Sequence, residues 1–210
     1  MKRHFWKLEY SITLFVLLGF FLLLVPVRFE NYFQAVMITQ WKDYYKKISY
    51  MFNVIDTQKN DDILKSLSCS NPEQRERILR HIIKPHLRLH SMNRIPWKYK
   101  QRYLNGSKVS KKDMHYFDDL YFNEKIIVGI KDIANVKEND ALFTMMIDIN
   151  GILPPNRWGK DIYGINIYDE GKILPYGYNE SLDKIKSDCS KNGRGLYCSY
   201  YYLIGGEFND

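Results

Sequence analysis

A long apolar run near the amino terminus constrains this chain more than any other feature. From Ile12 to Val27 the sequence reads ITLFVLLGFFLLLVPV, and Tyr10 and Ser11 extend it toward the amino terminus. A helix that crosses a membrane needs roughly 17 to 25 predominantly apolar residues. We therefore expect a transmembrane segment over about 10–27.

Beyond this run, apolar side chains recur at steps of three and four residues, which indicates one face of a helix. The members of this stripe are Phe33, Met37, Trp41, Tyr44, Ile48, Phe52 and Ile55. The sequence predicts one long helix over 5–55, apolar on all sides at first and on one side afterwards. Its one-sided part needs a partner surface elsewhere in the chain.

The charges around the run predict its orientation. Lys2, Arg3 and Lys7 precede it, whereas Arg28 beyond it is balanced by Glu30. Positive charge is retained on the cytoplasmic side, so we expect a cytoplasmic amino terminus and an external carboxyl-terminal domain. A cleaved secretory signal peptide is the alternative. The sequence LLLVPVRFENY, however, lacks the small residues that mark such a cleavage site.

Glu9 is the acidic residue at the start of the predicted span. An ionised side chain in a bilayer costs about 2.5–3.5 kcal/mol at the centre and less near the edge. Charge alone leaves two interpretations open. Glu9 either lies at headgroup depth, where the helix dipole favours it, or pairs with a cation on a neighbouring subunit.

A set of residues along the predicted helix falls in register, without a gap, with a known pattern. These residues are Phe5, Glu9, Ile12-Thr13-Leu14, Pro26, Asn31-Tyr32, Thr39, Lys42 and Tyr45. The pattern resembles the amino-terminal helix of type IV pilins and of the pseudopilins of type II secretion. The resemblance implies cleavage by a prepilin peptidase just before Phe5, followed by methylation of the new amine. It also implies docking of Glu9 on that amine in a neighbouring subunit, and a helix kink at Pro26.

The chain departs from this family at the cleavage position. The family has glycine before the cut, whereas this chain has His4, and Trp6 and Lys7 also replace small or apolar residues. A bulky imidazole where the peptidase expects no side chain predicts slow or blocked processing. Residues 1–4 would then remain attached as a short basic leader. An atypical site that is still cleaved is the alternative.

The remaining segment, 56–210, is long enough for a single domain with one core. The 17 tyrosines of the chain suit a sheet with half-exposed faces. Residues of high strand propensity predict strands at Lys125–Asp132, Ala141–Asp148, Ile162–Tyr168, Lys172–Leu174 and Tyr200–Ile204. The fold class is therefore α+β, with the long helix packed on an antiparallel meander over 124–210, as in pilins.

The segment 56–123 has fewer signals, and it does not match the family. Short helices are predicted at Asp61–Leu67, and from Pro72 until Pro85 stops the helix. HSMNRIPWKYKQRYLNGSK is predicted to be a loop, and Ser110 is a weak cap for a helix reaching about Tyr116. Near the carboxyl terminus, Asn179 or Ser181 is a candidate cap for a helix through about Lys186.

The three cysteines point to an oxidising compartment. Cys189 and Cys198 enclose a short loop rich in Gly, Ser and Asn, which predicts a disulfide and leaves Cys69 as the odd thiol. His81, His86 and His90 lack acidic partners at metal-ligand spacing, so we expect them on a solvated surface. The net charge of +7 comes from scattered residues without a nucleic-acid-binding motif, which disfavours nucleic acid as a partner.

A second run of residues matches the pseudopilin-like pattern. In chain order it comprises Asp148, Asn150, Gly151, Pro155, Asn156, Gly159, Asp161 and Tyr163, with Pro175 and Gly177 after them. Major pseudopilins of type II secretion bind calcium in a carboxyl-terminal loop, and Asp148, Asn150 and Asp161 offer the oxygen ligands that Ca²⁺ takes. Turns closed by Asn and Asp side chains explain the same residues without a metal, and we favour that interpretation.

The resemblance implies a structural subunit, not an enzyme, in a filament of the type II secretion or type IV pilus kind. Before assembly, it would be a single-pass protein of the bacterial inner membrane with a periplasmic head domain. Its partners would be other pilin-like subunits and the assembly platform. The alternative is an uncleaved, membrane-tethered binding protein that captures a ligand or DNA on a pilin scaffold.

Overall fold

The structure, a computed structural model, describes most of the helix and most of the sheet. The described residues are 2–57, 84–91, 99–111, 113, 120–123, 125–132, 141, 143–168 and 172–207. Within the first helix, the side chains of 2–8, 23–31 and 55–56 lie outside this description. The chain divides into two compact units, which are Met1–Ile38 (unit 1) and Thr39–Asp210 (unit 2).

The first element is a single helix, α1 (Lys2–Thr57), which confirms the prediction of one long helix. The helix is continuous at Pro26. In the described part of unit 1, large apolar side chains from Tyr10 to Leu22 are exposed, and Phe33 is exposed as well. Among the described residues, no helix is apolar over a length sufficient to cross a membrane. The predicted span extends into 23–27, whose side chains are outside the description.

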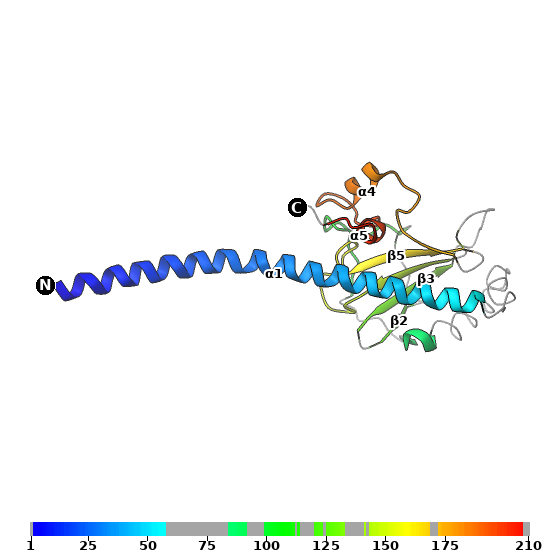
Figure 1. The fold of residues 1–210 in the computed structure, drawn as a ribbon, viewed down its shortest axis with the longest axis horizontal. Helices are drawn as coiled ribbons and strands as arrows, with labels where there is room; N and C mark the ends of the chain where they lie inside the picture. The colour runs from blue at the N-terminus through cyan, green and yellow to red at the C-terminus, as the bar shows by residue number, and fades with distance from the viewer. Residues whose placement is uncertain are drawn as a thin grey trace. The chain divides into compact units, whose positions relative to one another are not determined.

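Unit 2 contains a six-stranded antiparallel sheet with the order β1-β2-β3-β4-β5-β6 (Figure 1). The strands are β1 (His90–Ser91), β2 (Leu120–Phe122), β3 (Ile127–Asp132), β4 (Phe143–Asp148), β5 (Ile162–Ile167) and β6 (Ile173–Pro175). Each strand pairs with the next along the chain, so the predicted meander is confirmed for β3 to β6. The two short strands β1 and β2 extend it and lay outside the prediction.

One face of the sheet receives the second part of α1. The Trp41 ring stacks on the Tyr163 ring of β5, with 4.7 Å between centroids. The Trp41 indole Nε1–H also donates to the Ser199 carbonyl at 2.9 Å. Ile48 and Phe52 follow on the same helical face and are buried, as the stripe predicts. The helix therefore packs along β5 through large apolar and aromatic side chains.

The opposite face of the sheet is covered by segments that the sequence reasoning assigned to loops. Its core cluster consists of Tyr99, Tyr103, Val109, Ile127, Met146, Trp158, Ile162 and Leu196, with Tyr176 and Tyr197 packed against it. Side chains alternate between the faces of a strand, so Ile162 points to this cluster while Tyr163 points to α1. Both faces of β5 are thus buried, which explains its nearly continuous apolar sequence.

The predicted strand at Tyr200–Ile204 is wrong, because this segment belongs to helix α5 (Cys198–Leu203). Its aromatic content favours a strand by propensity alone. In the structure, the Tyr201 amide donates to the Tyr197 carbonyl at 3.1 Å and the Ile204 amide to the Tyr200 carbonyl at 3.2 Å. These bonds join residues four apart, as in a helix, and Tyr201 and Tyr202 are both buried.

The predicted carboxyl-terminal helix is confirmed as α4 (Leu182–Asp188), with Ser181 at the N-cap position but without a side-chain cap bond. Pro85 does not stop a helix, because residues 84–87 are helical and the Leu89 amide donates to the Lys84 carbonyl at 2.9 Å. The predicted helices within 61–83, Cys69, His81 and the segment 114–119 lie outside the described residues.

The Trp41 contact predicts a graded loss of stability. We expect Trp41→Ala to lower the free energy of unfolding of unit 2 by about 3–5 kcal/mol, because a fully buried indole is removed. Trp41→Phe should cost less, about 1–3 kcal/mol, since a ring remains but the Ser199 carbonyl loses its donor. Urea titration of the full chain in detergent micelles measures both.

The matched control is Tyr50→Ala, because Tyr50 is also an aromatic residue of α1 but is 72% exposed. It should change the unfolding free energy by no more than about 0.5 kcal/mol. Equal losses for Trp41→Ala and Tyr50→Ala would contradict the packing described above.

Candidate functional site

The polar loop that joins β4 to β5 is the candidate site, and Asp148 stands at its start. Asp148 is completely buried. Its Oδ1 accepts the Asn150 amide at 3.2 Å, and its Oδ2 accepts the Tyr99 hydroxyl at 3.0 Å. The first bond closes an Asx turn of the kind expected from the sequence. The second ties the loop to a segment about fifty residues earlier in the chain.

Asp161 closes the other end of the loop, and it is also completely buried. Its Oδ2 accepts the Asn156 amide at 2.8 Å, and its Oδ1 accepts the Arg157 amide at 2.6 Å. The Asp161 carbonyl accepts the Ile149 amide at 2.9 Å, which joins the two ends of the loop. One aspartate therefore fixes the backbone on both sides of the turn.

Asn156 lies between the two aspartates and links them. It is buried and adopts φ of 50°, in the left-handed region that Asn tolerates better than most residues. The amide orientation that satisfies its hydrogen bonding has Nδ2 donating to Asp148 Oδ2 at 3.2 Å. The same group reaches the carbonyls of Gly151 and Leu153 at 3.2 and 3.0 Å. The loop is thus held from inside by its own polar side chains.

Burial makes both carboxyl groups hold their protons more tightly. Desolvation raises the pKa of Asp161 to about 6, although the amides of Arg157 and Asn156 act in the opposite direction. Desolvation, together with the nearby charge of Asp161, raises the pKa of Asp148 well above its ordinary value. Burial also raises the pKa of the Tyr99 hydroxyl, so Tyr99 remains a hydrogen-bond donor to Asp148.

The structure brings together the candidate calcium ligands Asp148, Asn150 and Asp161. Each of the four carboxylate oxygens accepts an N–H or O–H group, as it would in a turn without metal. Asn150 Oδ1 is buried without a hydrogen-bond partner among the described residues. In that same part of the chain, no group of His, Cys, Asp and Glu has the makeup of a metal site. Calcium binding stays a prediction, and the contacts favour the structural turns.

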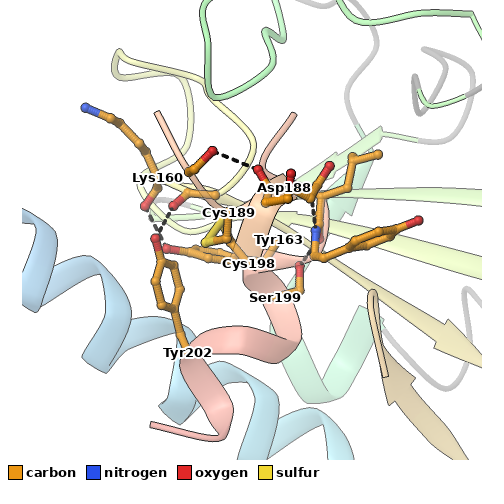
Figure 2. The surroundings of a disulfide bond; sticks show 12 residues. Lys160, Tyr163, Asp188, Cys189, Cys198, Ser199 and Tyr202 are labelled. Carbon is orange, nitrogen blue, oxygen red and sulfur yellow. Dashed lines mark hydrogen bonds between the residues drawn. A yellow bond between two sulfur atoms is a disulfide. The ribbon is translucent and has the colours of Figure 1, made fainter. Parts of the chain in front are cut away.

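A disulfide joins Cys189 to Cys198 and confirms the predicted pairing (Figure 2). Both cysteines are buried beside the polar loop. Gly159 adopts φ of +79°, and a Cβ built there would lie 2.6 Å from Cys198 Sγ. A side chain at this position would collide with the disulfide, which gives a physical reason for the glycine of the second sequence pattern.

The hydroxyl groups of two tyrosines fasten the end of the loop to its surroundings. Tyr202 of α5 donates to the Gly159 carbonyl at 3.0 Å, and Tyr163 of β5 donates to the Lys160 carbonyl at 2.8 Å (Figure 2). Ser199 Oγ accepts the Gly164 amide at 2.9 Å. The disulfide, α5 and the loop therefore form one connected structure.

The other candidate residues lie on α1. Glu9 is exposed, and its carbonyl accepts the Thr13 hydroxyl at 2.9 Å. The side chains of His4, Phe5 and Pro26 lie outside the described residues. The docking role of Glu9 and the cleavage before Phe5 remain predictions of the sequence.

Sequence reasoning missed Tyr99, which supplies the only side-chain hydroxyl bonded to Asp148 among the described residues. Tyr99 lies in a segment that was predicted to be a loop, and it is buried. Buried and exposed residues alternate in this segment: Tyr99, Gln101 and Tyr103 are buried, whereas Lys100 and Arg102 are exposed. A period of two residues indicates an extended segment with one side packed on a core.

Comparison with protein-family models, with curated proteins and with solved structures finds no match to this chain. The resemblance to pilins and pseudopilins therefore depends on the two sequence patterns alone.

The raised pKa of Asp161 predicts how stability depends on pH. Because the folded protein holds this proton more tightly than the unfolded chain, the stabilising contribution is complete below about pH 4 and is lost as the pH rises through about 6. Relative to the wild type, Asp161→Asn should gain up to about 3 kcal/mol of unfolding free energy between pH 4 and pH 7. Urea titrations at several pH values measure this difference.

Asp183→Asn is the control, because Asp183 is an exposed acid in the first turn of α4. Its difference from the wild type should change little over the same pH range. If the difference for Asp161→Asn is independent of pH, the buried carboxyl group is not the source of the pH dependence.

Proposed function

We propose that this protein is a pilin-like structural subunit of a filament of the type II secretion or type IV pilus kind. The subunit is stored in the bacterial inner membrane by the first part of α1, with unit 2 as its periplasmic head. It then enters a filament in which helices of other subunits replace the lipid.

One observation carries the proposal, namely the exposure of apolar side chains on every side of α1 in unit 1. Successive helical residues are about 100° apart, so the run from Leu14 to Leu18 passes around the whole helix. Its large side chains are 53–77% exposed. A helix that is apolar all round needs lipid or other helices around it. The sequence continues this run through Leu23, Leu24 and Val25.

The composition of unit 2 supports a passive, assembled role. Its large aromatic side chains are used for packing, as in the stack of Trp41 on Tyr163. Its buried aspartates accept backbone amides and the Tyr99 hydroxyl, which stabilises a loop and commits these groups to structure. A disulfide supports placement in an oxidising compartment such as the periplasm.

The second candidate function is an uncleaved, membrane-tethered binding protein on a pilin scaffold. His4 favours it, because the family has glycine at the position before the cut. The two functions differ in what surrounds α1. A filament subunit has α1 of another copy beside it, whereas a tethered monomer has lipid.

Cross-linking through α1 separates these functions. We introduce Leu18→Cys into a Cys69→Ser background, since Leu18 is 53% exposed, and oxidise cells that assemble the filament. A filament subunit should give cross-linked dimers. In a His4→Gly background, in which cleavage supplies the Phe5 amine, Glu9→Gln should lower their yield on the order of tenfold or more, because it leaves that amine of a neighbouring subunit without its partner.

Asp43→Asn is the matched control, because Asp43 is also an exposed acid on α1. It should leave the yield of cross-linked dimers unchanged. Absence of dimers with Leu18→Cys alone would favour the tethered monomer, and equal yields for Glu9→Gln and Asp43→Asn would reject docking by Glu9.

His4 predicts that the wild-type chain keeps residues 1–4 in cells that contain prepilin peptidase. We expect the intact mass of the purified protein to correspond to the full 25.1 kDa chain. His4→Gly should restore cleavage, because it removes the side chain before the scissile bond. A wild-type protein that begins at Phe5 would contradict this prediction.

A further inference from the structure

Three basic side chains form a row on the surface of unit 2, which we call the basic row. It consists of Arg102, Lys108 and Arg157. Arg102 forms an antiparallel bridge with Lys108 and a parallel bridge with Arg157. Residues opposite one another in such bridges point to the same face, about 5 Å apart. Arg102 and Lys108 are exposed, and Arg157 is half-buried.

The two guanidinium groups of the basic row meet at Gly106. Arg102 Nη1 donates to the Gly106 carbonyl at 3.0 Å. Arg157 Nη2 would lie 3.6 Å from a Cβ built on Gly106. Like charges opposite one another destabilise a sheet. The row therefore carries a repulsion that a bound anion would relieve.

Acids do not neutralise this row within the part of the chain that the structure describes. The ion pairs there join Glu180 to Lys184, and Asp113 and Asp188 to Arg194. The nearest carboxyl group in sequence is Asp161, which is buried and accepts the backbone amide of Arg157. The Lys108 ammonium and the guanidinium N–H groups other than the one that Arg102 donates to Gly106 are thus available to an external anion.

An exposed apolar tip adjoins the basic row. Ile152 and Leu153 are 55% and 62% exposed. Their position is fixed by Asn156, whose side-chain amide reaches the Leu153 carbonyl at 3.0 Å. The Asn156 carbonyl in turn accepts the Arg102 amide at 3.0 Å, so the tip and the row belong to one hydrogen-bonded surface.

This surface lies at the end of unit 2 where its own part of α1 begins. Trp41 contacts Tyr163 near the start of β5. One helical turn later, Tyr45 donates to the Ile173 carbonyl, and Ile173 is paired with Ile167 at the end of β5. Within unit 2, α1 therefore runs along β5 in the same direction. The loop before β5 lies at the same end of unit 2 as Thr39, where the unit 2 part of α1 begins.

We propose that the basic row and the apolar tip together dock unit 2 on a membrane surface of anionic lipids. The proposal rests on the function proposed above, in which the chain before residue 39 is held in the bilayer. Cations attract the anionic headgroups, and Ile152 and Leu153 insert between them. Aliphatic side chains lack the aromatic face on which nucleobases stack, so the surface fits lipid better than single-stranded nucleic acid.

The test uses the full chain reconstituted in lipid nanodiscs. A fluorophore is attached at Leu153→Cys in a Cys69→Ser background, and the discs contain a quencher-labelled lipid. We expect quenching in discs with phosphatidylglycerol and little in discs of phosphatidylcholine alone. Each cation near an anionic surface strengthens docking roughly fivefold. A triple variant without the three charges of the basic row, Arg102→Gln with Lys108→Gln and Arg157→Gln, should therefore dock on the order of 100-fold more weakly.

The matched control is Lys172→Gln, Lys186→Gln and Lys191→Gln combined, which removes the same charge from exposed positions outside the surface. It should keep the quenching of the parent protein. Equal quenching in both kinds of disc, or equal loss in both triple variants, would overturn the proposal. So would binding of labelled single-stranded DNA that depends on the basic row, because the surface would then recognise nucleic acid.

Retention of the protein in the discs separates this proposal from the function on which it rests. A chain that elutes apart from both kinds of disc overturns both proposals. A chain that stays in both discs without lipid-dependent quenching overturns the docking surface alone.

Discussion

The contact between Trp41 and Tyr163 is the constraint on which the rest of unit 2 depends. The stacked rings join α1 to β5, and the Trp41 N–H joins α1 to α5 through Ser199. Tyr163 also contacts Tyr202 edge to face, with 6.1 Å between ring centroids. Aromatic pairs of this kind add specific geometry to a large buried area. One ring pair thus fixes where the helix, the sheet and the disulfide-linked end of the chain meet.

The polar loop is built on this apolar anchor. Its last residue, Asp161, directly precedes β5, whose next residues Ile162 and Tyr163 are buried on opposite faces of the sheet. The position of β5 therefore fixes where the Asp161 carboxyl group lies, and the amides of Asn156 and Arg157 bond to it there. A buried acid costs free energy unless its hydrogen bonds are complete. The aspartates are tolerated because the loop and the Tyr99 hydroxyl supply those bonds.

The elements that the sequence predicted correctly are those whose pattern is local. The helical stripe that contains Trp41 has a regular period, and β3 to β6 are rich in residues of strand propensity. The strand predicted at Tyr200–Ile204 failed because propensity does not report the neighbouring disulfide or the burial of adjacent tyrosines. Tyr99 and Arg102 were missed because their partners, Asp148 and Arg157, are about fifty residues away. Pairing over such a distance leaves little trace in the local sequence.

Membrane docking and filament assembly would draw on the same subunit, so each affects the other. If only an undocked head can enter the filament, the apparent affinity for assembly is reduced by the fraction of heads that remain docked. The basic row makes that fraction depend on anionic lipid and on salt, since surface charges are screened within about 8 Å at physiological ionic strength. The exposed apolar side chains of α1 do not depend on lipid charge in this way, because lipid tails and neighbouring helices both remove them from water. Headgroup charge would therefore control the release of the head, while the apolar helix tolerates either environment.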